Sequence, residues 1–268
     1  MADRDDELPG HRPMTLLLAA LWTVALFLLG NVVVGVAEDV RSGAFSDIVT
    51  QGAAAALATS LVIFLMVRVH AREVSLRATV GVLPVAPLHA VLAASAGAGM
   101  YPLMATIDGL ARKRWPLPEA TMELLEKLQS VSTPGTRVAF VVSAFVVMPL
   151  ADELFFRGIL YGELRRATSA RTAALATTVL YAVSQLDWRA LPTTLALGLA
   201  LARLRERSGG VVAPVVAHVA YWAVVGVPIL RGADPNAVVT YPPRWIVGGA
   251  VIALLALVAV GAGSRRED

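Results

Sequence analysis

Apolar residues occur in long uninterrupted runs that are separated by short charged segments. A bilayer has a hydrocarbon core about 30 Å thick, which a helix of about 20 apolar residues can cross. Eight uncharged runs are candidates for such helices: residues 14–37, 48–67, 82–107, 138–151, 172–186, 190–201, 209–230 and 245–263. The pattern predicts an all-α fold, a polytopic transmembrane bundle of about eight helices.

Three of the runs are shorter than a span. The run at 138–151 becomes long enough only if the helix continues through residues 151–160, Ala-Asp-Glu-Leu-Phe-Phe-Arg-Gly-Ile-Leu. Asp152, Glu153 and Arg157 must then lie in or near the membrane. We expect the runs at 172–186 and 190–201 to be tilted or covered by neighbouring helices.

Composition supports a lipid environment. The chain is 57% apolar and 16% charged, whereas a soluble domain has about 45–50% and about 25%. The absence of cysteine excludes disulfides, thiolate metal sites and cysteine nucleophiles. The net charge is +3, but the basic residues are spread among short loops, so we expect membrane lipids and not nucleic acid as partners.

The boundaries of the apolar runs define one unit. We predict a polar N-terminal tail at 1–13, a bundle at 14–263 and a polar C-terminal tail at 264–268, because no repeat or linker marks a second domain. The first run is longer than a signal-peptide core and follows acidic as well as basic residues. We therefore expect it to remain as a helix.

Arginine placement predicts the orientation. With the N-terminus in the cytoplasm, most Lys and Arg lie inside, in the N-terminal tail and around 68–77, 157–171, 203–207 and 265–266. The cytoplasmic (plasma) membrane is the expected location. The exception is Arg112-Lys113-Arg114, which precedes an amphipathic stretch at 118–129. We interpret that stretch as a helix on the membrane surface.

The charged residues of the fourth run are the first candidate site. A charge at mid-membrane costs about 2.5–3.5 kcal/mol, and a Leu or Val returns only about 0.3–0.6. Glu153 and Arg157 are four residues apart, which favours an ion pair on one helical face. Asp152 points about 100° away and is free to act elsewhere. Alternatively, all three cap a helix end at the membrane boundary.

His218 and Gln185 are the second candidates. His218 lies midway through an uncharged run, so we expect it to meet Asp152 or Glu153; the alternative is a neutral ring bonded to a backbone carbonyl. Gln185 follows Tyr181 on one helical face and can orient water but cannot act as a base. Hydrogen bonding between helices is the alternative for Gln185.

The other histidines and the double glycine are weaker candidates for a functional site. We expect His70 and His89 to be interfacial, since the first lies among arginines at a membrane exit and the second follows two prolines. Gly209-Gly210 is too short for a phosphate loop and predicts a helix break.

Three motifs in order resemble those of the CAAX-protease and bacteriocin-processing (CPBP, or Abi) family of intramembrane proteases. Asp152-Glu153-Leu-Phe-Phe-Arg157 resembles its Glu-Glu-x-x-x-Arg, Tyr181-Ala-Val-Ser-Gln185 its Phe-x-x-x-His, and His218-Val-Ala-Tyr-Trp222 its His-x-x-x-Asn. The resemblance covers residues 137–230, which would form the core of the bundle.

The resemblance implies roles by position. Asp152 would be the base, Gln185 would replace the water-activating histidine, and His218 and Trp222 would face the oxyanion, with Glu153 and Arg157 in support. Losing an oxyanion donor reduces rates by about 10²- to 10³-fold, and losing proton transfer by about 10²- to 10⁴-fold. No cofactor is predicted from the residues, and a divalent metal (zinc) is implied only by the resemblance, because Gln185 removes a metal ligand.

These observations lead to three hypotheses of function. The first is an intramembrane endopeptidase with reduced or altered activity on transmembrane or C-terminal peptides. The second is an inactive pseudoprotease that binds membrane peptides or acts as a scaffold. The third is a small proton-coupled transporter, although the sequence has no evident inverted repeat. Convergence of Asp152, Gln185 and His218 on one polar cavity would favour the first.

Overall fold

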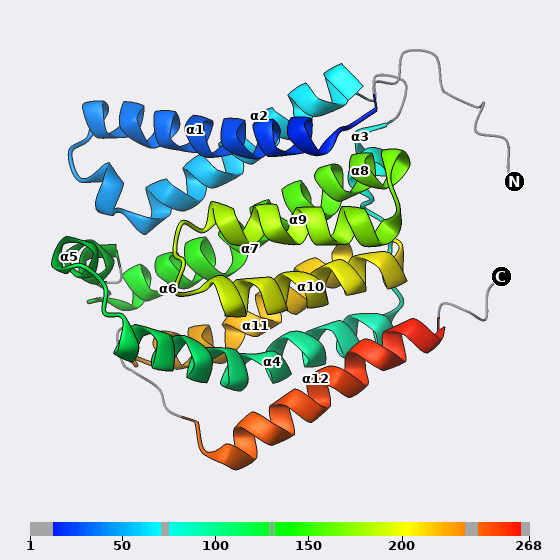
Figure 1. Ribbon diagram of the computed structural model, residues 1–268. Helices are drawn as coiled ribbons and strands as arrows, with labels where there is room; N and C mark the ends of the chain where they lie inside the picture. Colours follow the sequence, from blue (N-terminus) through cyan, green and yellow to red (C-terminus); the bar gives the residue numbers. More distant parts are fainter. Residues whose placement is uncertain (1–12, 71–74, 129, 131, 234–240, 264–268) are drawn as a thin grey trace, which may run out of the picture.

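The computed structural model describes residues 13–70, 75–128, 130, 132–233 and 241–263, and within them every regular element is helical. Figure 1 shows long helices lying side by side with alternating directions. The elements in chain order are α1 (Leu16–Val40), η1 (Ala44–Ser46), α2 (Ile48–His70), α3 (Leu76–Val80), α4 (Pro87–Arg114), α5 (Glu119–Leu128), α6 (Pro134–Val142), η2 (Ser143–Val147), α7 (Met148–Glu153), η3 (Leu154–Leu160), α8 (Tyr161–Ala167), α9 (Ala170–Ser184), α10 (Leu191–Ser208), α11 (Val212–Leu230) and α12 (Pro243–Gly263).

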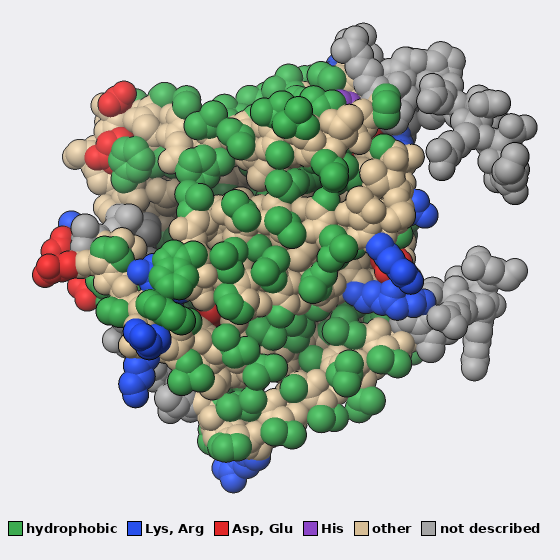
Figure 2. Space-filling model, viewed as in Figure 1, with side chains coloured by type: hydrophobic (Ala, Val, Ile, Leu, Met, Phe, Trp, Pro, Cys, Tyr) green, Lys and Arg blue, Asp and Glu red, His purple; other side chains and the backbone are tan. Residues whose placement is uncertain are grey.

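The lengths and compositions of the helices confirm the all-α transmembrane bundle. In the part of the chain that the structure describes, six helices are long and apolar enough to cross a membrane: α1, α2, α4, the composite helix α6–α8, α11 and α12. The shorter α9 and α10 lie among them (Figure 1). On the face drawn in Figure 2, hydrophobic side chains cover the middle of the bundle and charged side chains lie mostly towards its ends. The protein is a membrane protein.

The fourth run continues through its charged residues, as predicted. Helical structure extends without a break from Pro134 to Ala167. It begins with a capping box, in which the Thr133 hydroxyl accepts from the Thr136 N–H and the Thr136 hydroxyl accepts from the Thr133 N–H. Two π-helical segments, η2 and η3, interrupt its α-helical ladder. Such segments are frequent at functional sites, and η3 contains Arg157.

Two helices end later in the chain than the apolar runs that predicted them. Helix α4 begins at Pro87 instead of Val82 and continues through Arg112-Lys113-Arg114, and α10 continues to Ser208. Proline is favourable at the first helical position. Basic side chains are favourable in the last turn, where they complement the helix dipole, so charge ends a hydrophobic run without ending the helix.

Small residues allow α4 to touch two neighbours. A Cβ added to Gly97 would lie 1.8 Å from the carbonyl oxygen of Ala217 on α11, and one added to Gly99 would lie 2.7 Å from that of Gly249 on α12. Close backbone approach at small residues is a main source of helix association in membranes. The α4–α11 contact fixes the height of α11 and therefore of His218.

Several local predictions can also be compared with the structure. Gly209 has φ +70° and ends α10, which confirms the helix break. The amphipathic stretch forms α5, and Gln129 at its end lies outside the described residues, as do tail residues 1–12 and 264–268 and Arg72. The short elements η1 and α3 were not predicted, because three and five residues give no readable periodicity.

Candidate functional site

Glu153 binds both of its predicted partners with one oxygen. Arg157 Nη1 donates to Glu153 Oε1 over 3.1 Å, and His218 Nδ1 lies 2.9 Å from the same atom. A carboxylate oxygen can only accept, so the contact assigns the ring proton to Nδ1. Glu153 and Arg157 are 0% exposed and His218 is 1% exposed. The predicted ion pair and the predicted meeting of His218 with a carboxylate are both confirmed.

Arg157 extends this cluster to two further helices. Its Nη2 donates to the carbonyl of Gly198 on α10 over 3.3 Å, and its guanidinium carbon lies 4.5 Å from the centroid of the Tyr181 ring on α9. Among the described residues, Glu153 Oε2 and Arg157 Nε are buried without a hydrogen-bond partner. One buried guanidinium thus joins η3, α9 and α10.

Arg205 is a supporting residue that sequence reasoning did not single out. Its Nε donates to the carbonyl of Arg157 over 2.7 Å, its Nη1 donates to the Gly209 carbonyl, and its guanidinium lies over the Tyr161 ring. It is 9% exposed. In the sequence it is one of three alternating arginines, and no pattern distinguishes the buried one from its neighbours.

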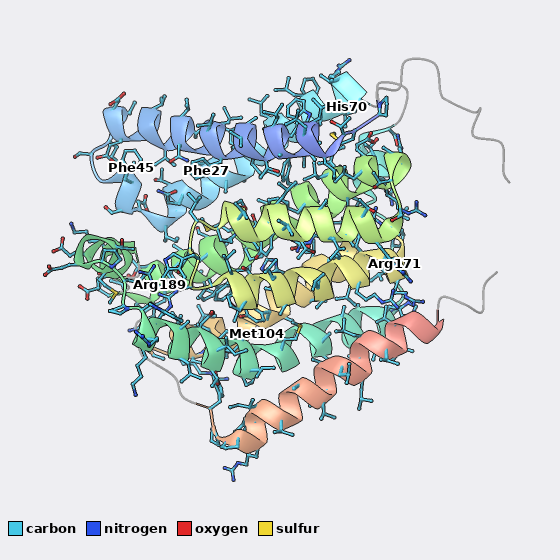
Figure 3. All side chains as sticks on the ribbon, in the orientation of Figure 1. Phe27, Phe45, His70, Met104, Arg171 and Arg189 are labelled. Atoms are coloured by element: carbon cyan, nitrogen blue, oxygen red, sulfur yellow. The ribbon has the colours of Figure 1, made fainter. Side chains whose placement is uncertain are left out.

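Asp152 and Gln185 line one cavity of about 310 Å³. Its walls come from α1, α2, α7, η3 and the end of α9, and Figure 3 labels two of its aromatic residues, Phe27 on α1 and Phe45 in η1. The lining residues are Thr23, Leu26, Phe27, Gly30, Asn31, Val34, Phe45, Gln51, Ala54, Ala55, Ala58, Thr59, Met148, Ala151, Asp152, Phe156, Ser184 and Gln185. The adjacent Asp152 and Glu153 therefore have separate environments, as their helical offset predicted.

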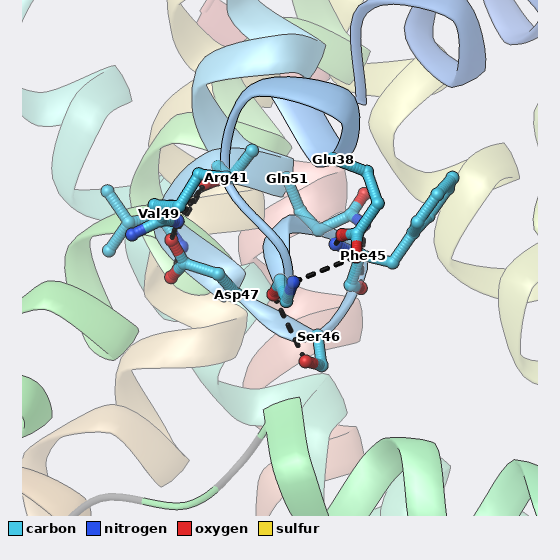
Figure 4. A network of polar contacts seen from close by, with 9 residues as sticks. Glu38, Arg41, Phe45, Ser46, Asp47, Val49 and Gln51 are labelled. Carbon is cyan, nitrogen blue, oxygen red and sulfur yellow. Dashed lines mark hydrogen bonds and ion pairs between the residues drawn. The ribbon is translucent and has the colours of Figure 1, made fainter. Parts of the chain in front are cut away.

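A polar network holds the connection between α1 and α2 at this cavity (Figure 4). Glu38 accepts from the N–H groups of Gly43 and Phe45 over 2.8 and 2.9 Å. Gln51 Nε2 donates to the Phe45 carbonyl over 3.0 Å, and Arg41 pairs with Asp47. Since Phe45 and Gln51 both line the cavity, the network fixes part of its wall.

The end of α9 places Gln185 on the wall of the cavity that Asp152 also lines. Gln185 is the C-terminal cap of α9, and the next residue, Leu186, has φ +52°, which turns the chain away from the helix. The Ser184 hydroxyl donates to the Tyr181 carbonyl over 2.8 Å. The helix thus ends at the cavity wall, where an amide group can hold water.

His218 and Trp222 do not line this cavity. His218 is bound to Glu153, and Trp222 stacks on Phe145 with a ring separation of 5.2 Å and an interplanar angle of 1°. Trp222 also has edge contacts with Tyr101 and Tyr221. Of the three groups whose convergence would favour hydrolysis, the structure brings Asp152 and Gln185 to one cavity and places His218 on the other carboxylate.

His70 differs from its predicted environment. It lies in the last turn of α2, but it is only 2% exposed, and Trp22 Nε1 on α1 donates to its Nε2 over 3.1 Å. The prediction was an interfacial ring, because arginines flank it in the sequence. In the structure Trp22, 48 residues away, covers it. His89 is partly exposed in the first turn of α4.

The donor set does not suit zinc. The described residues contain no group of three His, Cys, Asp or Glu side chains able to hold a metal. Asp152 shares the cavity wall with an amide, that of Gln185, and the imidazole of His218 is engaged by Glu153. Zinc sites in proteins take nitrogen, sulfur and carboxylate ligands, and the amide of Gln185 is not one of them.

Comparison with protein families gives a match in the middle of the chain. Residues 134–224 match the family described as type II CAAX prenyl endopeptidase Rce1-like. This region is Rce1-like. The match confirms the resemblance to the CPBP family that the three motifs indicated. No curated protein and no solved structure matches the chain.

The Rce1-like region covers about a third of the chain and includes all six candidate site residues, from Asp152 to Trp222. It supplies α7, η3, α9 and most of α11. The opposite wall of the cavity, formed by α1 and α2, lies outside the match. The cavity therefore combines an Rce1-like wall with one that the family match does not describe.

Proposed function

We propose that this protein is a CAAX-type intramembrane endopeptidase with an altered site, in which Asp152 is the general base and Gln185 holds the attacking water. The observation that carries the proposal is the placement of Asp152 and Gln185 on the wall of one largely apolar cavity. A carboxylate and an amide provide a proton acceptor and a hydrogen-bonding group for one water molecule.

The reaction needs only these groups and water. Asp152 accepts a proton from water while the water oxygen bonds to the scissile carbonyl carbon. The proton then passes to the leaving nitrogen as the C–N bond breaks, which yields a carboxyl and an amine and restores Asp152. Because His218 is held by Glu153, it contributes to the position of Asp152 through the helix and lies apart from the proposed water.

The rate should be low for this class of enzyme. Asp152 reaches about 1 Å less far than a glutamate, a scale to which catalytic geometry is sensitive. Gln185 cannot transfer a proton near neutral pH. Restoring the longer acid by Asp152→Glu, or the titratable ring by Gln185→His, should therefore increase the rate.

Cleavage by purified full-length protein in lipid nanodiscs tests the proposal. Fluorogenic apolar peptides should be cut by the wild type, and Asp152→Asn should lower the rate at least about 100-fold, as expected for loss of a general base. Asp108→Asn is the control, since Asp108 is a partly buried carboxylate on α4 that accepts from Thr193 over 2.6 Å and lies outside the cavity. Equal rates in wild type and Asp152→Asn would reject Asp152 as the base.

A pseudoprotease is the second candidate, and the position of Trp222 favours it. The indole stacks on Phe145 instead of lining the cavity, so it offers no donor to an oxyanion there. In this case the cavity binds a membrane peptide, or the protein acts as a membrane scaffold, and no peptide bond is hydrolysed. Activity that appears only in the double variant Gln185→His with Trp222→Asn would support it, and full activity in the wild type would rule it out.

We also propose a cytoplasmic N-terminus in the plasma membrane. The ends of α2, α8 and α10 lie at the same end of the bundle as the start of α1 (Figure 1). The last turns of these three helices contain Arg68, Arg165, Arg166, Arg205 and Arg207. Arg171 is labelled at that end and Arg189 at the other (Figure 3). Cysteine labelling tests this orientation: a cysteine at Arg171 should react only from the cytoplasm, and one at Arg114 only from outside.

A further inference from the structure

The hydroxyl groups on the cavity wall differ in whether their protons are already engaged. Three of the lining residues carry a hydroxyl: Thr23, Thr59 and Ser184. Thr23 Oγ1 donates to the Ala19 carbonyl over 2.9 Å, and Ser184 Oγ donates to the Tyr181 carbonyl over 2.8 Å. In the part of the chain that the structure describes, Thr59 Oγ1 makes no hydrogen bond, although Thr59 is only 4% exposed. Its proton is therefore available to a molecule in the cavity.

The next residue on α2 makes the bond that Thr59 lacks. Ser60 Oγ donates to the Ala56 carbonyl over 2.7 Å, which is the usual local bond of a hydroxyl inside a helix. Ser60 is exposed and does not line the cavity. Two adjacent hydroxyls on one helix thus have different surroundings, and only that of Thr59 faces the site.

Helical geometry places Thr59 at about the depth of Asp152. Helix α2 packs against η2, α7 and η3, and it runs in the same direction as the composite helix α6–α8 (Figure 1). The two helices meet at Gly52, where an added Cβ would lie 3.0 Å from Ser143 Cβ. Thr59 is seven residues beyond Gly52 and Asp152 is nine beyond Ser143, which correspond to about 10 and about 13 Å along the helices. The two residues therefore differ in depth by less than one helical turn.

Gln185 lies at a similar depth. The rings of Phe156 and Tyr181 are in contact, with a centroid separation of 5.4 Å, and α9 runs opposite to the composite helix (Figure 1). Asp152 is four residues before Phe156 and Gln185 is four after Tyr181, so both lie about one turn from this contact in the same direction. The proposed base, the amide that holds water and the Thr59 hydroxyl are therefore close to one depth of the cavity.

Peptide hydrolysis creates a negative oxygen that needs a donor. As water adds to the scissile carbonyl carbon, the carbonyl π electrons move to the oxygen, which becomes an oxyanion. The backbone N–H groups of a membrane helix are engaged within the helix, so a side chain is needed as the donor. Trp222 stacks on Phe145 away from the cavity, and the protons of the other two lining hydroxyls go to carbonyls of their own helices.

We propose that the Thr59 hydroxyl donates a hydrogen bond to this oxyanion and is a further catalytic residue of the site. The hydroxyl keeps its proton. The proton that Asp152 takes from water still passes to the leaving nitrogen as the carbonyl re-forms and the C–N bond breaks. The inference rests on the proposed function, because it takes Asp152 as the base. It assigns part of the chemistry to α2, which lies outside the Rce1-like region.

The variant Thr59→Val tests this role, because it keeps the shape of the side chain and replaces the hydroxyl with a methyl group. In nanodiscs with fluorogenic apolar peptides, kcat should fall about 10²- to 10³-fold, as for loss of one oxyanion donor, and KM should stay nearly constant. Thr59→Ser retains the hydroxyl and should recover most of the lost rate. Ser60→Ala is the matched control and should keep the wild-type rate, since the Ser60 hydroxyl is bonded within its own helix outside the cavity.

Binding of two uncleavable peptides separates hydrogen bonding from packing. A peptide with a phosphinate in place of the scissile amide has the tetrahedral shape and negative oxygens of the transition state, whereas a peptide with a trans-alkene there has no oxygen. Thr59→Val should weaken binding of the phosphinate about 10- to 100-fold, the effect of one hydrogen bond to a charged group. It should leave the affinity of the alkene unchanged.

The outcomes distinguish this inference from the proposed function. Equal kcat values in wild type and Thr59→Val overturn the role of Thr59 and leave Asp152 as the proposed base. A higher KM at unchanged kcat, a Thr59→Ser variant as slow as Thr59→Val, or weaker binding of both uncleavable peptides also overturns it. If the wild type cuts no peptide, the proposed function fails and this inference fails with it.

Discussion

His218 Nδ1 lies 2.9 Å from Glu153 Oε1, the same oxygen that accepts from Arg157. The imidazole and the guanidinium therefore share the second carboxylate of the acidic pair. This arrangement ties α11 to the composite helix α6–α8, and it leaves Asp152 on the cavity wall. Two adjacent acids thus have different tasks, one in the packing of helices and one at the cavity.

The shared carboxylate should be a major contributor to stability. Glu153→Gln keeps the size of the side chain but leaves Arg157 buried without a counter-charge, and removing one partner of a buried pair costs about 3–5 kcal/mol. Glu206→Gln is the control, since Glu206 pairs with Arg203 over 2.7 Å at the surface, where a pair is worth under about 1 kcal/mol. The free energy of unfolding in mixed micelles, measured for the wild type and both variants, gives the two losses.

The pair can also be replaced as a whole. Glu153→Leu with Arg157→Met should be more stable than Glu153→Gln, because it removes the isolated charge together with its partner. If the single and double variants unfold alike, the charge is not the origin of the loss.

Gly198 should be needed for the position of Arg157. A Cβ at Gly198 would lie 2.9 Å from Thr178 Cγ2 and 3.1 Å from Arg157 Nη2. Gly198→Ala should therefore displace the guanidinium and destabilise the protein by about 1–3 kcal/mol. In Gly109→Ala, on α4, the new Cβ meets nothing within 4 Å, and stability should rise by about 0.5–1 kcal/mol. Equal effects in the two variants would contradict the crowding argument.

Trp222 should act mainly in packing. Trp222→Asn removes the ring that stacks on Phe145 and should lower the free energy of unfolding by about 2 kcal/mol or more. Trp245→Asn is the control, because Trp245 is 61% exposed at the start of α12. Gln185 lines the cavity, so Gln185→His should change the free energy of unfolding little. A stable Trp222→Asn with unchanged unfolding would show that the stacking is dispensable.

The connection between α1 and α2 should weaken in acid. Burial raises the pKa of Asp47, but hydrogen bonds from Thr50, Arg41 and the Val49 N–H outweigh burial and hold the pKa below its usual value. Its contribution is complete above the unfolded pKa of about 3.9 and is lost as the pH falls through the lower folded value. Being partly exposed, it should amount to under about 1 kcal/mol.

Unfolding of wild type and Asp47→Asn as a function of pH measures this contribution. The variant should be less stable at neutral pH, and the difference should shrink at pH values below about 4. Asp39→Asn, which removes an exposed carboxylate at the end of α1, serves as the control. A difference that stays constant with pH would mean that the Asp47 charge is not involved.

The amino-acid sequence determined the features that depend on one helix at a time. The apolar runs predicted the helices, and the four-residue spacing of Glu153 and Arg157 predicted their ion pair, because neighbours on a helix are fixed by its own geometry. The ends of α4 and α10 were less readable, since arginines end an apolar run but are favourable in the last turn of a helix.

Only the tertiary structure decided which helices meet. It selected Glu153 instead of Asp152 for His218, placed Arg205 on the Arg157 carbonyl, covered His70 with Trp22, and formed the cavity by packing α1 and α2 against α7 and α9. These partners are 48 or more residues apart in the chain. Such contacts depend on the crossing points of helices, which small residues such as Gly97 set through close packing, and helical periodicity within one segment does not specify them.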